Sequence, residues 1–422
     1  MKKYVAMLLL ISLALLSCQR NEENENSVNK ISNAVVLEWN EIAYQAFGGT
    51  SYQHSLMAAR INAMTQIAVH DAINAIEPVY QFYVFNGSDK EADPIAAVAS
   101  AAYTVLLNEI PAKKSFLDSA LQKTLATVTN AAAKEKGVEL GKQAANAIIK
   151  ARFNDGSAGD PFAPIEPSTA PGVYQAVPPF TFQFAPYWEN LFLFGLQSKD
   201  QFRPKPYPGI NTPEYAKAFD EVKAVGKNNS TTRTTDQSNY AKFWYEFSEA
   251  GWNRLTRTVA KDKNLKLAET ARLMALVDMA LADAYTAGWD AKLYYNFWRP
   301  YTAIRNAAND GNDATTADAT WEPSEVTPPI HDYPSTHSAL GNAAATVLAR
   351  LLGDNTAFSF GSVMAVPSMS TRSFTSFSQA AKENADSRVM AGIHFRFSCE
   401  AGLELGAKIG DWIVDNKLKP LK

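Results

Sequence analysis

Cysteine is scarce in this sequence of 422 residues, which contains only Cys18 and Cys399. So few thiols cannot build a disulfide framework, and the fold must therefore rest on its apolar core. The formal net charge is −3, and no global excess of basic residues indicates a nucleic acid as partner. The HExxH, Walker A and GxSxG motifs are all missing. No motif therefore indicates a zinc peptidase, a P-loop NTPase or an α/β-hydrolase.

The N-terminus has the organisation of an export signal. Two lysines precede an apolar run from Tyr4 to Leu16, which is shorter than the roughly 20 residues that cross a bilayer. The run ends in Leu-Leu-Ser directly before Cys18 and resembles a bacterial lipobox. Residues 1–17 are therefore predicted to be a lipoprotein signal peptide, and Cys18 is predicted to carry the lipid. The alternative is a plain cleaved signal in which Cys18 has no role.

Residues 18–33 are polar and acidic, and they are predicted to form a tether because they offer little apolar surface to bury. No later segment is long and apolar enough to span a membrane. We therefore expect an exported protein that is attached to the outer membrane by its lipid alone, on the periplasmic or the cell-surface side. With Cys18 lipidated, Cys399 has no partner for a disulfide.

Helical periodicity covers most of the remaining chain, so the predicted fold class is all-α. The candidate helices are residues 35–47, 51–76, 93–110, 114–128, 131–153, 212–226, 235–250, 267–306, 335–352, 374–385 and 387–414. The longest is expected to bend near Arg299-Pro300, and residues 358–366 are expected to form a minor strand or a loop. Residues 34–213 are predicted to be an N-terminal helical region, and residues 214–422 a C-terminal helical core.

Residues 160–213 differ from the rest because they are rich in proline and aromatic residues and show little periodicity. A loop of this length inside a compact protein usually carries function or wraps the surface. Its aromatic content predicts that it packs over the helices.

Three short polar patterns stand out in the last third of the chain. Lys292 and Arg299 are two helical turns apart and share a face, so they require an anion, which a buried carboxylate could also supply. Ser335 is a good N-cap, and a helix N-terminus with His337 in its first turn suits an oxyanion, although Ser335 could serve only as the cap. Arg388 and His394 are placed on one helix, where a long Arg side chain can converge with the imidazole on one ligand.

Taken together, these patterns read Lys292-x6-Arg299-Pro300, Pro334-Ser335-Thr336-His337 and Ser387-Arg388-x5-His394. They closely resemble the signature shared by the vanadium-dependent haloperoxidases and the type 2 phosphatidic acid phosphatases. The wording around Arg299 and His394, Asn-Phe-Trp-Arg-Pro and Gly-Ile-His-Phe-Arg-Phe, is similar to that of the haloperoxidase branch. The stretch 63–76 also resembles bacterial members.

The resemblance implies helical bundles with the site at one end of the C-terminal bundle. Lys292, Arg299 and Arg388 would bind the oxygens of vanadate or phosphate, together with the Ser335 hydroxyl and the Thr336 amide. His394 would be the axial ligand of vanadium, and His337 would act as acid or base at the opposite apex. A haloperoxidase would use vanadate, hydrogen peroxide, a halide and a small organic acceptor, with Lys292 polarising the peroxide. A phosphatase would need no cofactor and would pass a phosphoryl group through His394.

Three positions depart from the family pattern. Thr336 replaces a glycine, and a β-branched residue resists a positive φ. Ser398 replaces an aspartate that in the phosphatases orients the nucleophilic histidine, which puts that chemistry in more doubt than oxyanion binding. His331 lies one residue after the position where haloperoxidases often place a halide-tuning residue, and here that position is Ile330. His331 is therefore assigned a place on the halide side.

The sequence predicts a haloperoxidase first and an acid phosphatase second. A surface glycan-binding lipoprotein is the non-enzymatic alternative, for which the aromatic segment from Pro161 to Tyr207 would be the binding face. The last alternative is a family member that has lost its activity, which the departures at Thr336 and Ser398 would indicate. The halide, the phosphate ester and the oligomeric state do not follow from the sequence.

Overall fold

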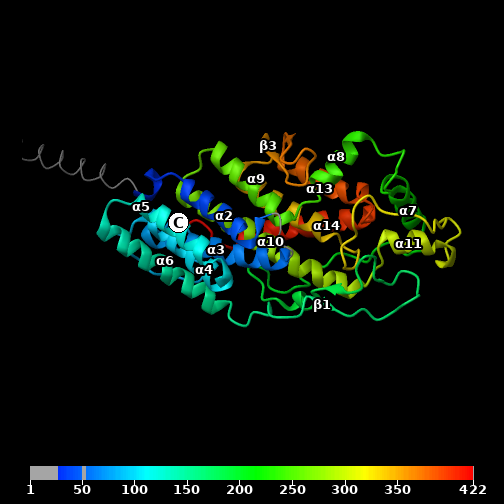
Figure 1. Ribbon diagram of the computed structural model, residues 1–422, viewed down its shortest axis with the longest axis horizontal. Coiled ribbons are helices and arrows are strands. Elements are labelled where there is room, and N and C mark those ends of the chain that lie inside the picture. The colour runs from blue at the N-terminus through cyan, green and yellow to red at the C-terminus, as the bar shows by residue number, and fades with distance from the viewer. Residues whose placement is uncertain (1–26, 50–53, 422) are drawn as a thin grey trace, which may run out of the picture.

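A computed structural model describes residues 27–49 and 54–421, and its fold is the predicted all-α one (Figure 1). Most of the longer helices run roughly along the long axis of the molecule. They are α2 (Ala34–Phe47), α3 (Ser55–Ile76), α4 (Pro94–Glu109), α5 (Lys114–Ala126), α6 (Ala131–Ala151), α7 (Pro213–Val225), α8 (Thr235–Phe243), α9 (Ser248–Asp262), α10 (Leu267–Tyr295), α11 (Pro300–Asn306), α12 (Thr336–Leu352), α13 (Phe377–Met390) and α14 (Arg396–Asn416). Short 3-10 helices add η1 (Ser27–Lys30), η3 (Pro111–Lys113), η4 (Pro186–Asn190) and η5 (Ala307–Asn309).

Strands are minor in this fold. β1 (Phe162–Ala163) pairs with β2 (Gln183–Phe184), and β3 (Phe358–Gly361) pairs with β4 (Thr371–Phe374), both antiparallel. The β3–β4 hairpin places Phe358 opposite Phe374. Residues 358–361 confirm the strand alternative of the prediction for 358–366. Residues 371–373 of β4 lay outside any predicted element, and Phe374 was wrongly predicted to begin a helix.

Helix α10 lies in the middle of the molecule and is buried on nearly all sides up to Lys292. It packs against α3 from the N-terminal half and against α12 and α14 from the C-terminal half. A helix that is apolar all round is stable only in such a surrounded position. One apolar core consequently runs from Val28 to Leu418 and joins the two predicted regions.

Glycines bring α12 and α14 into close backbone contact. A Cβ added at Gly402 would lie 2.3 Å from the Ser335 carbonyl oxygen, and one at Gly406 would lie 2.2 Å from that of Ala339. Both distances are far below van der Waals contact, so only glycine permits this approach. The stripe therefore fixes the position of Ser335, the residue that begins α12.

Three predicted helix boundaries are wrong. The predicted helix 235–250 is broken after α8 at Trp244, and the following helix α9 was not predicted. The predicted helix 267–306 ends at Tyr295, because Asn296 is left-handed with φ 47° and Pro300 starts the separate helix α11. Arg388 belongs to α13 and not to the last helix, because a turn at Gly392 with φ 78° separates α13 from α14.

The proline- and aromatic-rich segment 160–213 wraps over the helices as predicted. Tyr174 and Trp188 are buried in it, and Trp289 of α10 donates from its indole Nε1 to the Phe184 carbonyl oxygen. Tyr83 donates from its hydroxyl to the Phe194 carbonyl oxygen. These contacts fasten the segment to the bundle.

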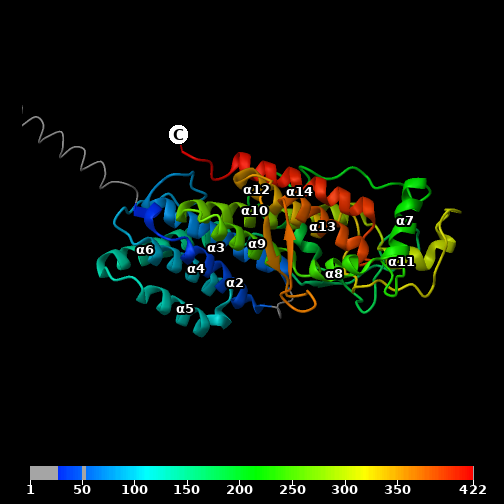
Figure 2. The same ribbon diagram turned by 90° about the horizontal axis from the view of Figure 1, so that it is seen from above.

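The predicted signal peptide and Cys18 lie outside the described residues. The predicted tether to residue 33 is too long, because the chain already packs on the core from η1 onward. Val28 is buried, and the Asn33 side chain donates to Ala260 O and Thr270 Oγ1. In the described parts of the chain no helix combines the length and the apolarity needed to cross a membrane. Figure 2 shows α5 and α6 at one end of the molecule and α7 and α11 at the other.

Candidate active site

The predicted site residues come together at the ends of five helices. Lys292 lies in the last turn of α10, Arg299 caps the start of α11, and Ser335 caps the start of α12. Arg388 lies in the last turn of α13, and His394 lies in the turn that leads into α14. Helix ends offer unpaired backbone groups, which makes such a meeting point suitable for a polar ligand.

Lys292 and Arg299 both hold the chain segment Ile330–Asp332. Lys292 Nζ donates to the carbonyl oxygens of His331 at 2.6 Å and Asp332 at 2.9 Å. Arg299 Nε donates to Ile330 O at 2.7 Å. Burial and the neighbouring Arg299 hold the pKa of Lys292 well below its ordinary value. The two side chains therefore fix the position of residues 330–332, and their positive charges repel each other.

His394 is not placed by a helix, contrary to the prediction. Its ring Nε2 lies 3.0 Å from Arg299 Nη1, and Arg299 Nη1 also donates to Ile393 O at 2.7 Å. A guanidinium can only donate, so His394 Nε2 accepts and carries a lone pair. Burial, followed by the charges of Arg299, Lys292 and Arg388, holds the pKa of His394 well below its ordinary value. The ring is therefore neutral with its proton on Nδ1.

Asp332 faces the other side of the same ring. Its Oδ1 lies 2.9 Å from His394 Nδ1 and 3.9 Å from Arg299 Nη1. The alignment with Nδ1 falls short of a regular hydrogen bond, but neither atom has another partner among the described residues. The second oxygen, Oδ2, accepts a short hydrogen bond from Ser398 Oγ. Burial raises the pKa of Asp332 to about 6, against the lowering effect of Arg299 and Lys292.

Ser335 and Thr336 begin α12 at the site. Ser335 Oγ accepts from the Ser338 amide and hydroxyl, and the Ser335 amide donates to Ser398 O. Thr336 does not have a positive φ, so the expected conflict with its β-branched side chain does not arise. Space for that side chain comes from Gly288 of α10, where an added Cβ would lie 2.6 Å from Thr336 Oγ1.

Arg388 is buried and held by the connection between α8 and α9. Its Nη1 donates to Trp244 O at 3.3 Å, and its guanidinium carbon lies 5.4 Å from the ring centroid of Tyr245. Burial lowers the pKa of Arg388 to about 10, so it is charged at neutral pH. The break after α8 therefore makes this contact possible, because in a continuous helix the Trp244 carbonyl oxygen would accept from a backbone amide of the same helix.

His337 in the first turn of α12 is half-buried. Its Nδ1 lies 2.9 Å from Ser248 Oγ at the start of α9. Its Nε2 has no hydrogen bond of regular geometry, although the Trp244 carbonyl and Asn384 are close enough to favour the protonated ring. Burial and the charge of Arg388 outweigh them and hold the pKa of His337 well below its ordinary value. A neutral imidazole with a free Nε2 can exchange a proton with a ligand.

His331 is the middle residue of the segment that Lys292 and Arg299 hold, and its carbonyl oxygen accepts from Lys292 Nζ. Its ring packs against Tyr174 with the centroids 4.4 Å apart, and the Tyr174 hydroxyl and His331 Nδ1 both lack partners in the described chain. Burial and the charges of Lys292 and Arg299 lower the pKa of His331 to about 3. The predicted halide-side residue is therefore a neutral ring at the edge of a positively charged region.

The charges of this cluster fit an oxyanion. The side chains of Lys292, Arg299 and Arg388 are buried around His394, and Arg299 lies 3.9 Å from the carboxylate of Asp332. Neither Lys292 nor Arg388 has a carboxylate at ion-pair distance in the part of the chain that the structure describes. Arg388 Nε, Thr336 Oγ1 and His337 Nε2 are buried without hydrogen-bond partners in that same part. Uncompensated buried charge is unfavourable, so an anion with several oxygens fits these donors.

The sequence is related to known proteins over this part of the chain. Residues 272–421 match the model of the VCPO second helical-bundle domain. The vanadium chloroperoxidase of Curvularia inaequalis is 28% identical over 220 residues, which cover 44% of this chain and 35% of that protein. The chain therefore spans about a third of the length of that relative.

Solved structures extend the likeness to most of the chain. The first bacterial vanadium-dependent iodoperoxidase superposes with a TM-score of 0.80 at 27% identity, covering 93% of this chain and 98% of that one. The chain has the vanadium haloperoxidase fold. An apo-type bacterial vanadium-dependent chloroperoxidase shares this fold with a TM-score of 0.70, at 17% identity, over 84% of this chain and 92% of that one.

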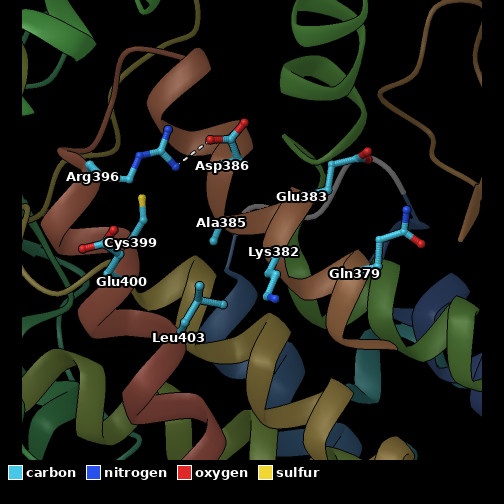
Figure 3. Close-up of a pocket in the computed structure, with 9 residues that line it drawn as sticks. All are labelled: Gln379, Lys382, Glu383, Ala385, Asp386, Arg396, Cys399, Glu400 and Leu403. Carbon is cyan, nitrogen blue, oxygen red and sulfur yellow. Dashed lines mark ion pairs between the residues drawn. The ribbon is translucent and has the colours of Figure 1, made fainter. Parts of the chain in front are cut away.

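A concave surface region of the molecule lies away from these residues. It is a surface groove of about 490 Å³ between α13 and α14, lined by Lys382, Asp386, Arg396 and Leu403 among others (Figure 3). Arg396 and Asp386 form an ion pair across it. None of the predicted site residues lines this groove, and no cluster of histidine, cysteine and carboxylate side chains in the described chain could hold a metal ion.

Several residues of the site were not predicted from the sequence. Asp332, Ser248, Tyr174 and Gly288 all contact predicted site residues. Asp332 lies three residues before Ser335, so its proximity to the motif was a usable signal. The other three come from distant segments, and nothing in their local sequence distinguishes them from ordinary core or capping residues.

Proposed function

We propose that this chain is a vanadate-dependent haloperoxidase, which oxidises a halide with hydrogen peroxide and passes the halogen to a small organic acceptor. The observation that carries the proposal is the buried group of Lys292, Arg299 and Arg388 around the lone pair of His394 Nε2. The haloperoxidase fold supports it. Vanadate is the cofactor that this donor set suits, because the cationic side chains would bind its oxygens and His394 Nε2 would offer a nitrogen ligand.

Each residue has a distinct task in this proposal. Arg299 and Arg388 bind oxygens of the anion through their planar guanidinium groups. Lys292 adds a third positive charge, and Ser335 Oγ and the Thr336 amide add hydrogen-bond donors at the start of α12. His394 Nε2 would provide the nitrogen ligand for vanadate. Vanadate, when bound, supplies a Lewis acid that activates peroxide without changing its own oxidation state.

His337 is proposed to move the proton that the reaction consumes. Oxidation of a halide by hydrogen peroxide to hypohalous acid takes up one proton for each water that is released. His337 Nε2 has no hydrogen bond of regular geometry among the described residues, and Ser248 Oγ lies 2.9 Å from Nδ1 and fixes the ring. A fixed neutral imidazole exchanges this proton without first needing to reorient.

Iodide is the proposed first substrate. It is the halide most easily oxidised, and one similar solved structure is an iodoperoxidase. The neutral ring of His331, which packs at an angle against Tyr174, is proposed to line the path of the halide. The positive charges behind it favour entry of an anion.

A second candidate, phosphomonoester hydrolysis through His394, is favoured by one observation. A carboxylate on the Nδ1 side of a histidine supports attack by Nε2, and Asp332 lies on that side. In this reaction His394 Nε2 would attack phosphorus, while His337 would protonate the leaving alcohol. The glycan-binding alternative finds less support, because Tyr174, Trp188 and Phe194 of the aromatic segment are buried.

The deciding experiment measures halogenation of an organic acceptor by protein lacking residues 1–18, with iodide, bromide and chloride, and with or without orthovanadate. Turnover that needs both peroxide and orthovanadate, and that disappears in His394→Ala, is expected. Hydrolysis of p-nitrophenyl phosphate without vanadate is measured in parallel. Uptake of orthovanadate with no halogenation and with phosphatase activity would replace the first proposal by the second.

We also propose that the chain is exported and held at the outer membrane by a lipid on Cys18, on the strength of the N-terminal sequence. In a Gram-negative host, the full-length chain is expected in the outer-membrane fraction. Cys18→Ser is expected in the soluble periplasmic or culture fraction. Equal membrane association of the two would refute the lipid anchor.

A further inference from the structure

We propose that Asp332 is a positioning residue, which holds the Nδ1–H of His394 so that the Nε2 lone pair stays on the side of Arg299, where the oxyanion is proposed to bind. The part of this inference that concerns vanadate rests on the proposed function. The part that concerns the contact between the two side chains does not depend on it.

The tautomer of His394 determines what Asp332 contacts. Arg299 Nη1 is a donor at 3.0 Å from Nε2, so the ring proton lies on Nδ1. In water an imidazole side chain prefers the opposite tautomer, with the proton on Nε2. The site therefore selects the less favoured form, and it requires an acceptor beside Nδ1. Asp332 Oδ1, at 2.9 Å, is that acceptor.

Asp332 is itself fixed from several directions. Ser398 Oγ donates to its Oδ2, and the Phe395 amide lies close enough to stabilise the carboxylate. Its backbone amide donates to Phe297 O at 2.9 Å, and its carbonyl oxygen accepts from Lys292. A carboxylate so restrained can define the orientation of a neighbouring ring to within a small angle.

An ion-pair role with Arg299 does not account for this geometry alone. Oδ1 is 3.9 Å from Arg299 Nη1, which is a full ångström longer than its distance from His394 Nδ1. Both atoms are buried, lie 2.9 Å apart and have no other hydrogen-bond partner among the described residues. Such a contact is expected to become better aligned when a ligand fixes the ring. The contact with His394 Nδ1, and not the longer one with Arg299, therefore explains the position of Asp332 Oδ1.

Ser398 has a supporting role in this arrangement. Ser398 lies one turn after His394 and contacts the far oxygen of Asp332. The carboxylate for His394 thus comes from the segment before α12, and Ser398 serves as its support. Moving the carboxylate from 332 to 398 should consequently preserve the function, whereas removing it should not.

A direct test uses proton NMR of the protein with labelled histidine, with and without orthovanadate. The chain has five histidines, so the resonances can be assigned by single substitutions. We expect a downfield Nδ1–H resonance typical of an imidazole bonded to a carboxylate, lost in His394→Gln and in Asp332→Ala. Its persistence in folded Asp332→Ala would overturn the proposal. This arm decides the contact even if the wild-type protein binds no vanadate, a result that would sink only the proposed function.

The second test measures the affinity for orthovanadate by titration calorimetry. Removal of such a partner typically weakens binding about 10–100-fold, and that loss is expected for Asp332→Asn and Asp332→Ala. The double variant Asp332→Ala/Ser398→Asp is expected to recover most of the lost affinity for orthovanadate. The single variant Ser398→Asp is not expected to bind orthovanadate more tightly than wild type. Wild-type affinity in folded Asp332→Ala, or no recovery in a folded double variant, would contradict a positioning role.

Discussion

The side chain of Thr336 in α12 fills the space that a Cβ would take at Gly288 in α10. A Cβ at 288 would lie 2.6 Å from Thr336 Oγ1 and 2.8 Å from its Cγ2. The glycine therefore accommodates the larger residue that stands directly after Ser335. This pair explains how the start of α12 keeps its place with threonine in the motif.

Gly288→Ala is expected to displace Thr336 and to destabilise the protein by about 1–3 kcal/mol through overpacking. The affinity for orthovanadate should fall as well, because the Thr336 amide moves. Urea unfolding and titration calorimetry measure the two effects. Gly288→Ala/Thr336→Gly should restore affinity, because glycine removes every atom of the collision.

The matched control is Gly251→Ala in α9. A Cβ there would find its nearest atom, Glu246 Oε2, at 3.6 Å, which is ordinary contact. Because alanine is the better helix former, this variant should be as stable as wild type or about 0.5–1 kcal/mol more stable. An equal loss in both variants would show that the effect at 288 is not specific to Thr336.

Arg388→Lys is expected to weaken orthovanadate binding by roughly 10–100-fold, which corresponds to losing a hydrogen bond to a charged group. The positive charge is retained in lysine, but the planar guanidinium group is lost and with it the Arg388 Nε donor, which has no partner among the described residues. Arg396→Lys is the control, because Arg396 makes its ion pairs with Glu221 and Asp386 outside the cluster. Similar affinities in Arg388→Lys and wild type would mean that charge alone, and not geometry, holds the anion.

Ser248→Ala is expected to lower kcat by roughly 3–10-fold, the value of one hydrogen bond, and to leave orthovanadate affinity unchanged. Ser248 touches His337 Nδ1 and no other predicted site residue, so its loss should affect proton exchange and not anion binding. Steady-state kinetics and calorimetry separate the two. Ser359→Ala in the exposed hairpin is the control. A kcat equal to that of wild type would remove Ser248 from the mechanism.

His70 should make the protein less stable in mild acid. It is buried in α3, its Nε2 lies 3.1 Å from Gln81 O, and burial lowers its pKa from 6.5 to about 4. Between these values the unfolded chain binds the proton and the folded chain does not, so stability falls as pH falls. From pH 7 to 5 this group removes about 2 kcal/mol.

Urea unfolding of wild type and His70→Gln at both pH values measures this contribution. The loss on acidification should be smaller in the variant by that amount. Asp278, whose pKa is raised to about 7 by burial, acts in the opposite direction but is common to both proteins and cancels. Parallel pH curves for the two proteins would show that His70 is not the group responsible.

The amino-acid sequence by itself determined the all-α class, the order of most helices and the motif residues. Those features depend on local periodicity and on side-chain chemistry read within a few residues of one another. The motif also predicted that Lys292, Arg299 and Arg388 act together, although each pattern taken alone had an ordinary structural alternative.

Only the tertiary structure decided how these residues meet. The sequence placed Arg388 and His394 on one helix, but Gly392 turns the chain between them, and a positive φ at glycine is not visible in periodicity. It also treated Ser398 as a lost carboxylate, whereas Asp332 brings one to His394 from another segment. Contacts between residues 62 positions apart arise from the packing of α12 against α14, and neither helix encodes that packing alone.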